Sequence, residues 1–451
     1  MTTTSALERF QALLRVDTVS HSDESATDWS RFEVFAQLLE QFYPALHGAL
    51  ERDIVAGHSL LWRWRGTVDG DPAVLMAHYD VVSVTPEDWS SSPFSADTVL
   101  RPDGRTSVIG RGALDDKGSL VALLEAVEAA VLRGERPERD VYLLSTHNEE
   151  TAGDGAPSVV ALLAARGVRP RFVLDEGGNV RRGILPGVTT PIAVVGVTER
   201  GIMNLELTCR DAGGHASAPP PFPGLLATQR LARAIHRLTE NPFPSTLPEP
   251  IAELVQAAAP HADAAHAVWY AHPHEHPDAV IGALAAHSNR SAAMLRTTVA
   301  VTQLRGSTGA NVLASTASAV ANVRINPGGT VAGVVARIRD VIDDPQVEVD
   351  VRVAHEPSPV SSTGEPGDGG PYDVLRSVIR EVFPEAIVAP YVQTGGSDAR
   401  HFHAVSDGVY RFIPFEISPQ QQLGIHGADE SVEVDQFERA IVFYERLLHR
   451  L

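Results

Sequence analysis

Residues 110–118 read Gly110-Arg111-Gly112-Ala113-Leu114-Asp115-Asp116-Lys117-Gly118, which places two adjacent carboxylates between glycine-rich turns and a helix-forming segment. Apolar residues recur through 120–131 at the three- and four-residue spacing of an amphipathic helix, and Gly134 is a typical C-terminal end for it. Acidic residues directly before a helix often cap its free N–H groups and interact favourably with its dipole. The placement of the other acids and histidines therefore decides between a structural and a functional role.

Three short apolar runs end in polar residues that can bind a metal. The runs 73–77, 140–145 and 171–174 lead into His78-Tyr79-Asp80, into Thr146-His147-Asn148-Glu149-Glu150, and into Asp175-Glu176-Gly177-Gly178. Helical patterns at 120–132 and 158–166 lie between the runs, and this alternation predicts an α/β fold with a mostly parallel sheet. Because ligands bind beyond the carboxyl ends of parallel strands, we expect these side chains to meet there.

Length and composition favour a multidomain globular protein. The chain has 451 residues, of which 43% are hydrophobic and 21% charged, and two domains are the first expectation. Its net charge of −20 disfavours nucleic acid and anionic membranes as partners, which leaves a small molecule. The single cysteine, Cys209, excludes an internal disulfide framework and a cysteine-rich metal site. Without a signal-peptide pattern or a run of about 18 apolar residues, we expect a soluble, cytoplasmic protein.

A second domain is predicted within the first. Strand patterns at 201–210, 299–304, 319–325 and 347–353, with helices at 225–238 and 331–342, give the β-α-β-β-α-β order of a ferredoxin-like fold. The stretch 241–298, rich in Pro, Ala and His, interrupts it, and α/β texture returns after a linker at 358–370. We therefore predict a catalytic domain formed by residues 1–198 and 354–451 around an insert at 199–353. Helices are also expected at 6–14 and 29–43, the second ended by Pro44.

The polar residues at the strand ends have the composition of a metal site. They are His78, Asp80, Asp115, Asp116, Glu149, Glu150, Asp175, Glu176 and, far downstream, His426. Two imidazoles with surplus carboxylates suit zinc, manganese or cobalt, and do not suit copper or an iron–sulfur cluster. Converging carboxylates would raise one another's pKa, and two divalent ions about 3.5–4 Å apart, bridged by one carboxylate, would relieve this. The alternative, scattered caps and turns, fits poorly with three strand ends.

These motifs together resemble the co-catalytic zinc peptidase and aminoacylase family, which includes carboxypeptidase S, aminoacylases, succinyl-diaminopimelate desuccinylase and glutamate carboxypeptidases. The resemblance is nearest to the carboxypeptidase S branch and spans almost the whole chain. The motifs that carry it are Ala77-His78-Tyr79-Asp80, residues 110–118, Glu149-Glu150, Asp175-Glu176-Gly177-Gly178, Gly213-Gly214-His215-Ala216-Ser217 and Ile425-His426-Gly427. It implies a catalytic domain that binds two Zn²⁺, with Co²⁺ or Mn²⁺ possible, and an inserted lid and dimerisation domain.

The resemblance also implies roles for individual residues. His78 and Asp175 would bind one ion, with Glu176 as the one-residue alternative to Asp175. Glu150 and His426 would bind the other ion, and Asp115 would bridge the two ions. The peptide bond between Asp115 and Asp116 would be cis. Asp80 would orient His78, and Glu149 would be the general base that activates the attacking water and later protonates the leaving amine.

Four further residues are assigned to the substrate by the same resemblance. His215 would stabilise the oxyanion from the lid, often that of a second subunit, while Asn311 and Arg324 would hold the substrate. Arg400, within residues 395–400, is a second candidate for the substrate carboxylate, which an arginine fork binds well. Two of them have a structural alternative: a turn before a helix for His215, and a surface arginine in a turn for Arg400. After Asn311 the family often has a proline, where Leu313-Ala314 stand here.

The resulting hypothesis is a di-zinc hydrolase that cleaves an amide next to a free α-carboxylate, as a carboxypeptidase, dipeptidase or N-acyl-amino-acid hydrolase. One alternative is a metal-dependent binding protein without catalysis, against which Glu149 argues, because a binder needs no base beside Glu150. Another is phosphodiester hydrolysis, which the negative net charge disfavours. We expect a homodimer, the alternative being that the insert 241–298 covers the lid of a monomer. His272-Pro273-His274-Glu275-His276, in that insert, is expected to be a solvated loop.

Overall fold

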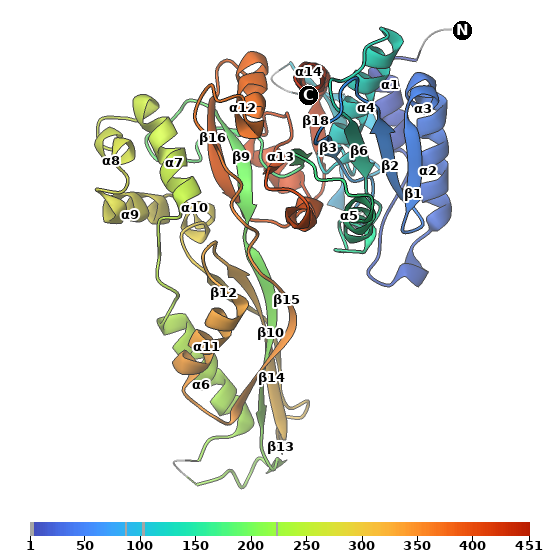
Figure 1. The fold of residues 1–451 in the computed structure, drawn as a ribbon. Coiled ribbons are helices and arrows are strands. Elements are labelled where there is room, and N and C mark those ends of the chain that lie inside the picture. The colour runs from blue at the N-terminus through green and yellow to red at the C-terminus, as the bar shows by residue number, and fades with distance from the viewer. Residues whose placement is uncertain (1–3, 86–87, 102–103, 222–223) are drawn as a thin grey trace. The chain divides into compact units, whose positions relative to one another are not determined.

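The computed structural model describes residues 4–85, 88–101, 104–221 and 224–451, which form two compact units (Figure 1). Unit 1 comprises the chain up to Ile184, Val188–Val197 and Ser361–Leu451, and unit 2 comprises Leu185–Gly187 and Thr198–Val360. The predicted insert, 199–353, falls inside unit 2, which extends further at its C-terminal end. Among the described helices, none has the length and apolar character needed to cross a bilayer.

Unit 1 is built on one mixed sheet whose centre is parallel. The strand order is β1-β2-β6-β3-β7-β17-β9-β16, with β8 beside β9. The four central strands β6, β3, β7 and β17 run parallel, whereas β1, β2 and β9 pair antiparallel with their neighbours. Their bounds are β1 Glu51–Val55, β2 Ser59–Trp64, β3 Ala73–Met76, β6 Val141–Ser145, β7 Phe172–Asp175, β8 Val180–Arg181, β9 Ile192–Glu199, β16 Ile387–Gln393 and β17 Val409–Arg411.

Helices cover both faces of this sheet because its strands are apolar on both sides. In β3, Leu75 packs against one set of helices and Val74 against the other, as the alternation of a strand requires. One set is α1 Ala6–Leu14, α2 Trp29–Phe42, α3 Pro44–Ala49, α4 Lys117–Leu132, α12 Pro371–Val382 and α14 Val434–Leu448. The other is α5 Gly155–Ala165 with the 3₁₀-helix η4 Asp398–Ala404. Pro44 follows the end of α2, as predicted, and also begins α3, where the missing N–H costs nothing.

A small sheet fixes the two loops that matter most for the site. Strands β4 Asp97–Leu100, β5 Thr106–Ile109 and β18 Ser431–Glu433 form it in the order β18-β5-β4. The last residue of β5, Ile109, lies opposite the first residue of β18, Ser431. The segment that leaves β5 at residue 110 and the segment that enters β18 at residue 430 are therefore neighbours. The second segment follows helix α13 Pro419–Gly424 and contains His426.

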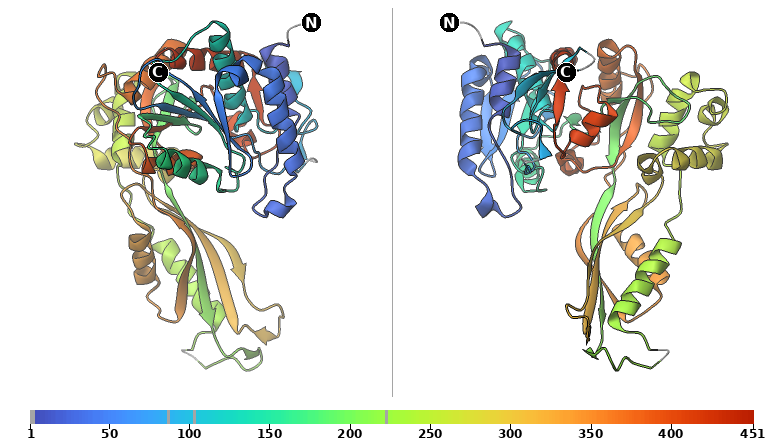
Figure 2. Two further views of the ribbon diagram at one scale, coloured as in Figure 1. Left: turned by 45° about the vertical axis from the view of Figure 1, so that its right-hand side comes forward. Right: turned by 180° about the vertical axis from the view of Figure 1, so that it is seen from behind.

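Unit 2 has the predicted ferredoxin-like order, with two helices on one face of a four-stranded antiparallel sheet (Figure 2). Its elements are β10 Gly201–Arg210, α6 Ala227–Glu240, β12 Thr298–Arg305, β14 Thr316–Ile325, α11 Val331–Ile342 and β15 Val347–His355, and the sheet order is β12-β14-β10-β15. The stretch 241–298 is largely helical, although the sequence predicted no elements there. It contains α7 Glu249–Ala258, α8 Ala267–Ala271, α9 Pro277–His287 and α10 Asn289–Ala293.

Candidate metal and catalytic site

Asp115 lies between two histidines that are distant in sequence. Its Oδ1 is 2.9 Å from His78 Nε2, and its Oδ2 is 3.1 Å from His426 Nε2. His426 Nε2 is also 3.0 Å from Glu150 Oε2. The Asp115–Asp116 peptide is cis, as the family resemblance implied. Each oxygen of one carboxylate thus faces a different imidazole, which is the arrangement a bridging ligand requires.

Asp80 holds both His78 and the adjacent glutamates. His78 Nδ1 is 3.0 Å from the backbone oxygen of Asp80, so Nε2 is turned toward Asp115. The Asp80 carboxylate is 3.4 Å from the same nitrogen, and it accepts hydrogen bonds from the backbone N–H groups of Glu149 and Glu150 at 3.1 and 3.2 Å. Ser20 Oγ donates to it as well, at 2.6 Å. Asp80 therefore sets the position of the glutamate pair, beyond the predicted orientation of His78.

Two overlapping groups of side chains bring potential ligand atoms within 4.8 Å of one another. One group is His78, Asp115 and Glu150, and the other is His78, Glu149 and Glu176. Of the predicted ligands, His78, Asp115, Glu150 and His426 are thus brought together, and the predicted base Glu149 lies beside them.

The structure groups Glu176, the predicted one-residue alternative to Asp175, with His78. The Asp175 carboxylate accepts a hydrogen bond from the backbone N–H of Ala399 at 2.7 Å and another from that of Glu176. Asp175 is the last residue of β7, and successive residues of a strand point to opposite sides. The side chain that reaches His78 is therefore the next one, Glu176. The sequence contained both acids but no signal that separated them.

Burial and mutual repulsion raise the pKa values of the glutamates. Burial raises the pKa of Glu149 well above its usual range, and the charges of Asp398 and Glu150 raise it further. Burial raises the pKa of Glu176 in the same way, and the charges of Asp115 and Glu149 add to it. Protonated glutamates, or a cation, are therefore needed to keep these side chains together.

The imidazoles compensate part of this negative charge. Hydrogen bonds to Asp115 and Glu150 raise the pKa of His426 to about 10. Burial raises the pKa of Asp115, but the hydrogen bonds from His426 and His78 outweigh it, and the pKa is lowered. The pKa of Asp115 is thus shifted in the opposite direction to those of Glu149, Glu150 and Glu176.

Of the predicted site residues in unit 2, His215 and Asn311 lie close together. The short strand β11 Gly214–His215 pairs with β13 Val312–Leu313, and the backbone N–H of Ala216 donates to the Asn311 oxygen at 2.9 Å, so His215 and Asn311 share one end of the unit. Ser217 donates its backbone N–H to His215 Nδ1 at 3.1 Å. Because an N–H can only donate, Nδ1 is an acceptor, and the neutral imidazole carries its proton on Nε2.

The two predicted arginines lie in different units. Arg324, in β14, donates from Nε to Asn322 Oδ1 at 3.1 Å, and Asn322 donates to Asn204 Oδ1 at 2.8 Å. These three residues form a polar row across β14 and β10. Arg400 lies in η4 of unit 1, where its Nε is 3.2 Å from His401 Nε2. The same helix is attached to the end of β7 through the Ala399–Asp175 hydrogen bond.

Comparison with known proteins identifies the family. Residues 74–450 match the model of Peptidase family M20/M25/M40. The N-fatty-acyl-amino acid synthase/hydrolase PM20D1 of Homo sapiens is 33% identical over 451 residues, covering 98% of this chain and 86% of the relative. The probable carboxypeptidase S-like 2 of Dictyostelium discoideum is 30% identical over 462 residues, covering 99% and 86%. The chain belongs to peptidase family M20.

Solved structures show the same fold. The M20 metallo-carboxypeptidase Sso-CP2 of Sulfolobus solfataricus has a TM-score of 0.70 at 18% identity, covering 99% of this chain and 98% of that one. Human carnosine dipeptidase 1 has a TM-score of 0.63 at 15% identity, covering 99% and 95%. As a member of this family, the chain is a metal-dependent hydrolase acting on peptide or N-acyl amino acid bonds, and the non-catalytic alternative is set aside.

The M20 site fits a divalent metal on the chemistry of its donors. It offers imidazole nitrogens and carboxylate oxygens, which suit zinc, manganese and cobalt. Glu150 Oε1 is buried and makes no hydrogen bond within the described part of the chain, so it is free to bind a cation. A cation among these acids would also relieve the repulsion that raises the pKa of Glu149 and Glu176.

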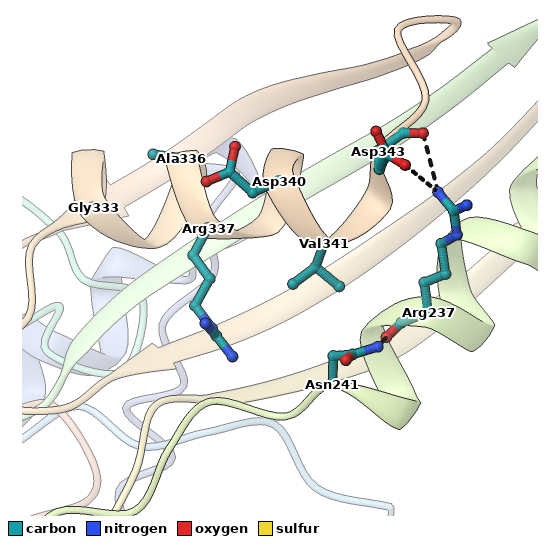
Figure 3. A pocket seen from close by; sticks show the side chains of 8 residues that line it. All are labelled: Arg237, Asn241, Gly333, Ala336, Arg337, Asp340, Val341 and Asp343. Carbon is teal, nitrogen blue, oxygen red and sulfur yellow. Dashed lines mark hydrogen bonds and ion pairs between the residues drawn. The ribbon is translucent and has the colours of Figure 1, made fainter.

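A groove of about 630 Å³ in unit 2 is a different feature. It lies between α6 and α11, and Arg237 donates to backbone oxygens at the end of α11, at 3.0 Å for Asp343 (Figure 3). Charged groups of both signs line it, including Arg337 and Asp340, and it contains none of the predicted site residues. We assign no catalytic role to it.

The choice between Asp175 and Glu176 as the ligand can be tested with two conservative variants. Glu176→Gln should lower the affinity for the first metal about 10-fold or more, because it removes a charged ligand. Asp175→Asn should keep the metal and lower the free energy of unfolding by about 1–3 kcal/mol, since it weakens hydrogen bonds to a charged acceptor. Metal content after dialysis and thermal unfolding measure these effects. Loss of metal from Asp175→Asn alone would restore the original assignment.

Proposed function

We propose that this M20 hydrolase removes the acyl group from N-acyl amino acids that carry a free α-carboxylate, with N-fatty-acyl amino acids as the first substrates to test. The observation that carries the proposal is that Glu149 and Glu150 lie beside different residues of the cluster. Glu150 lies 3.0 Å from His426, whereas Glu149 is grouped with His78 and Glu176. The substrate class is supported by the name of the PM20D1 relatives, which align over nearly the whole chain.

Two metal ions, most simply Zn²⁺, are part of the proposal. His78, Asp115, Glu150, Glu176 and His426 would hold them, and when bound they would supply a Lewis acid that polarises the substrate carbonyl and acidifies water. Glu149 would accept a proton from the attacking water and pass it to the leaving nitrogen. A carboxyl group with a raised pKa suits this task, because it must hold the proton between the two transfers. The backbone hydrogen bond to Asp80 fixes Glu149 for both.

Residues of unit 2 would bind the α-carboxylate of the substrate and the oxyanion that forms during the reaction. We propose that Arg324, supported by Asn322 and Asn204, binds the α-carboxylate together with Asn311, and that Arg400 is a second candidate from unit 1. His215 would donate its Nε2–H to the oxyanion that forms as the carbonyl is attacked, because Ser217 fixes its proton on that nitrogen.

A homodimer joined through unit 2 is also proposed, with His215 acting on the partner's substrate. Strand β12 is an edge strand of the unit 2 sheet, and such edges pair readily with a second copy. Several apolar residues of the helical stretch 241–298 are already buried, among them Ile251, Leu254 and Tyr270. It therefore offers little apolar surface with which to replace a subunit interface.

The activity itself is tested by a substrate screen. The metal-loaded protein should hydrolyse N-acyl amino acids, lose activity in strong chelator, and recover it with zinc, cobalt or manganese. Dipeptides serve as the competing class, and faster turnover of dipeptides would move the assignment to a dipeptidase. Undiminished turnover in strong chelator would contradict metal dependence.

Glu149→Gln and Glu150→Gln should separate the base from the ligand. Glu149→Gln should bind metal like the wild type and lower kcat by about 10²-fold or more, the scale of lost acid–base catalysis. Glu150→Gln should weaken metal binding, because its carboxylate faces His426. Metal analysis and steady-state kinetics on both proteins check this, and normal turnover by Glu149→Gln would be incompatible with the proposal.

Recognition of the carboxylate can be measured as a preference. The wild type should prefer an N-acyl amino acid over the same compound with its carboxylate converted to an amide. Arg324→Gln should reduce that preference by about 10- to 100-fold, the value of a charge-assisted hydrogen-bonded pair. Arg352→Gln is the matched control, because Arg352 lies in the same sheet but is exposed and pairs with Glu206. An equal loss in both variants would exclude Arg324 as the specific contact.

The donor nitrogen of His215 can be identified by amide replacements. His215→Gln places an N–H near the Nε2 position and should retain more activity than His215→Asn, whose N–H lies near Nδ1. The larger loss should be about 10²- to 10³-fold in kcat, the effect of removing one oxyanion donor. Mixing His215→Asn with Glu149→Gln should restore activity if the histidine acts across a dimer. Mixed dimers without activity would place His215 outside the partner's site.

A further inference from the structure

We propose that Glu430 is the positioning residue of the metal site, and that its carboxylate holds the turn carrying Asp115 and the loop carrying His426 in register. This inference rests on the proposed metal-dependent function. Glu430 lies four residues after His426 in a segment that the sequence did not single out. Its side chain is fully buried, with 0% exposed, at the point where β18 begins.

Both oxygens of Glu430 are committed to the Asp115 turn. Oε1 accepts hydrogen bonds from the backbone N–H groups of Leu114 at 2.7 Å and Asp115 at 3.0 Å. Oε2 accepts from the backbone N–H of Gly112 at 3.0 Å and from Arg111 Nη1 at 2.6 Å. Three backbone N–H groups of a buried turn, those of Gly112, Leu114 and Asp115, therefore share one carboxylate and would be unsatisfied without it.

Arg111 extends the same network to the other ligand. Its guanidinium, 2% exposed, donates from Nη1 to Glu430 and from Nη2 to the backbone oxygen of Gly427 at 2.8 Å. Gly427 directly follows His426. The backbone oxygen of Glu430 also accepts the N–H of Gly110 at 2.9 Å. The network thus continues the connection between the two segments beyond the last paired residues of the small sheet, Ile109 and Ser431.

Glu430 cannot itself be a metal ligand in this arrangement. A carboxylate has about four lone-pair positions, and four donors occupy those of Glu430. Its contribution must therefore pass through Asp115, whose backbone N–H it fixes, and through His426, whose loop it reaches by way of Arg111. The 2.9 and 3.1 Å contacts of Asp115 with the two imidazoles depend on that placement.

The test compares Glu430→Gln with Glu125→Gln. Glutamine keeps the size of Glu430 but offers one acceptor oxygen and a donor, so at least one backbone N–H loses its acceptor and Arg111 loses its counter-charge. Glu125 is a matched control, because it is also a buried glutamate paired with an arginine: it accepts hydrogen bonds from Arg9 at 2.6 Å and from Tyr43 at 2.9 Å, in the helix that follows the Asp115 turn.

Three properties are measured: the melting temperature of the metal-free protein, metal affinity by competition with a chromophoric chelator, and the visible absorption of the Co²⁺-loaded protein. Both variants should melt at a lower temperature than the wild type. Only Glu430→Gln should lower metal affinity by about 10- to 100-fold, the usual effect of losing a group that orients ligands, and change the Co²⁺ spectrum. A folded Glu430→Gln protein with wild-type affinity and spectrum overturns the proposal.

Arg111→Lys provides a second test should Glu430→Gln fail to fold. Lysine keeps a positive charge beside Glu430 and leaves the three backbone hydrogen bonds intact, but it cannot bind Glu430 and Gly427 through two nitrogens at once. It should weaken metal binding several-fold and change the Co²⁺ spectrum, and an unchanged affinity and spectrum would overturn the proposal. If the wild type binds no metal, the proposed function fails with it, whereas wild-type binding with normal variants refutes the positioning role alone.

Discussion

The repulsion between buried carboxylates is the constraint on which the rest of the catalytic unit depends. Burial raises the pKa of Glu149, Glu150 and Glu176, and the charges of neighbouring carboxylates raise it further. Such a cluster would not persist by apolar packing alone, because each ionised oxygen taken from water needs a compensating partner. The two imidazoles supply part of that compensation, and divalent metal ions are the simplest source of the remainder.

The positions of these acids are set by the backbone, through the pairing of the strands and the hydrogen bonds of the loops that follow them. Parallel strands β3, β6 and β7 end side by side, so the residues that follow them converge. Asp80 then ties the Glu149–Glu150 backbone to the end of β3. The backbone N–H groups of Glu149 and Glu150 thus donate to a further buried acid, Asp80.

The sequence predicted the frame of this protein well, since hydrophobic periodicity and strand-end chemistry are local signals. Helices at 6–14 and 331–342 and the strand at 201–210 were placed with their observed bounds. The helices of the stretch 241–298 were missed because its Pro, Ala and His content masks the pattern, although Ile251 and Leu254 are fully buried. Asp175 and Glu176 could not be separated, because the choice depends on which face of β7 meets His78, a tertiary property. Glu430 escaped notice because its partners lie more than 300 residues away.

The pairing of β5 with β18 has a consequence for how the protein is made. Unit 1 is discontinuous, and nearly all of unit 2, Thr198–Val360, is synthesised before the last segment of unit 1, Ser361–Leu451. When a ribosome has produced the first part, the chain already contains Asp115, Glu149, Glu150 and Glu176, but not the imidazole of His426 or the acceptor of the Asp115 turn. Until its last segment emerges, the nascent chain therefore has only His78 of the two imidazoles to compensate these acids. A message truncated before Glu430 and β18 would yield a protein without the strand that pairs with β5 and without the carboxylate that binds the Asp115 turn.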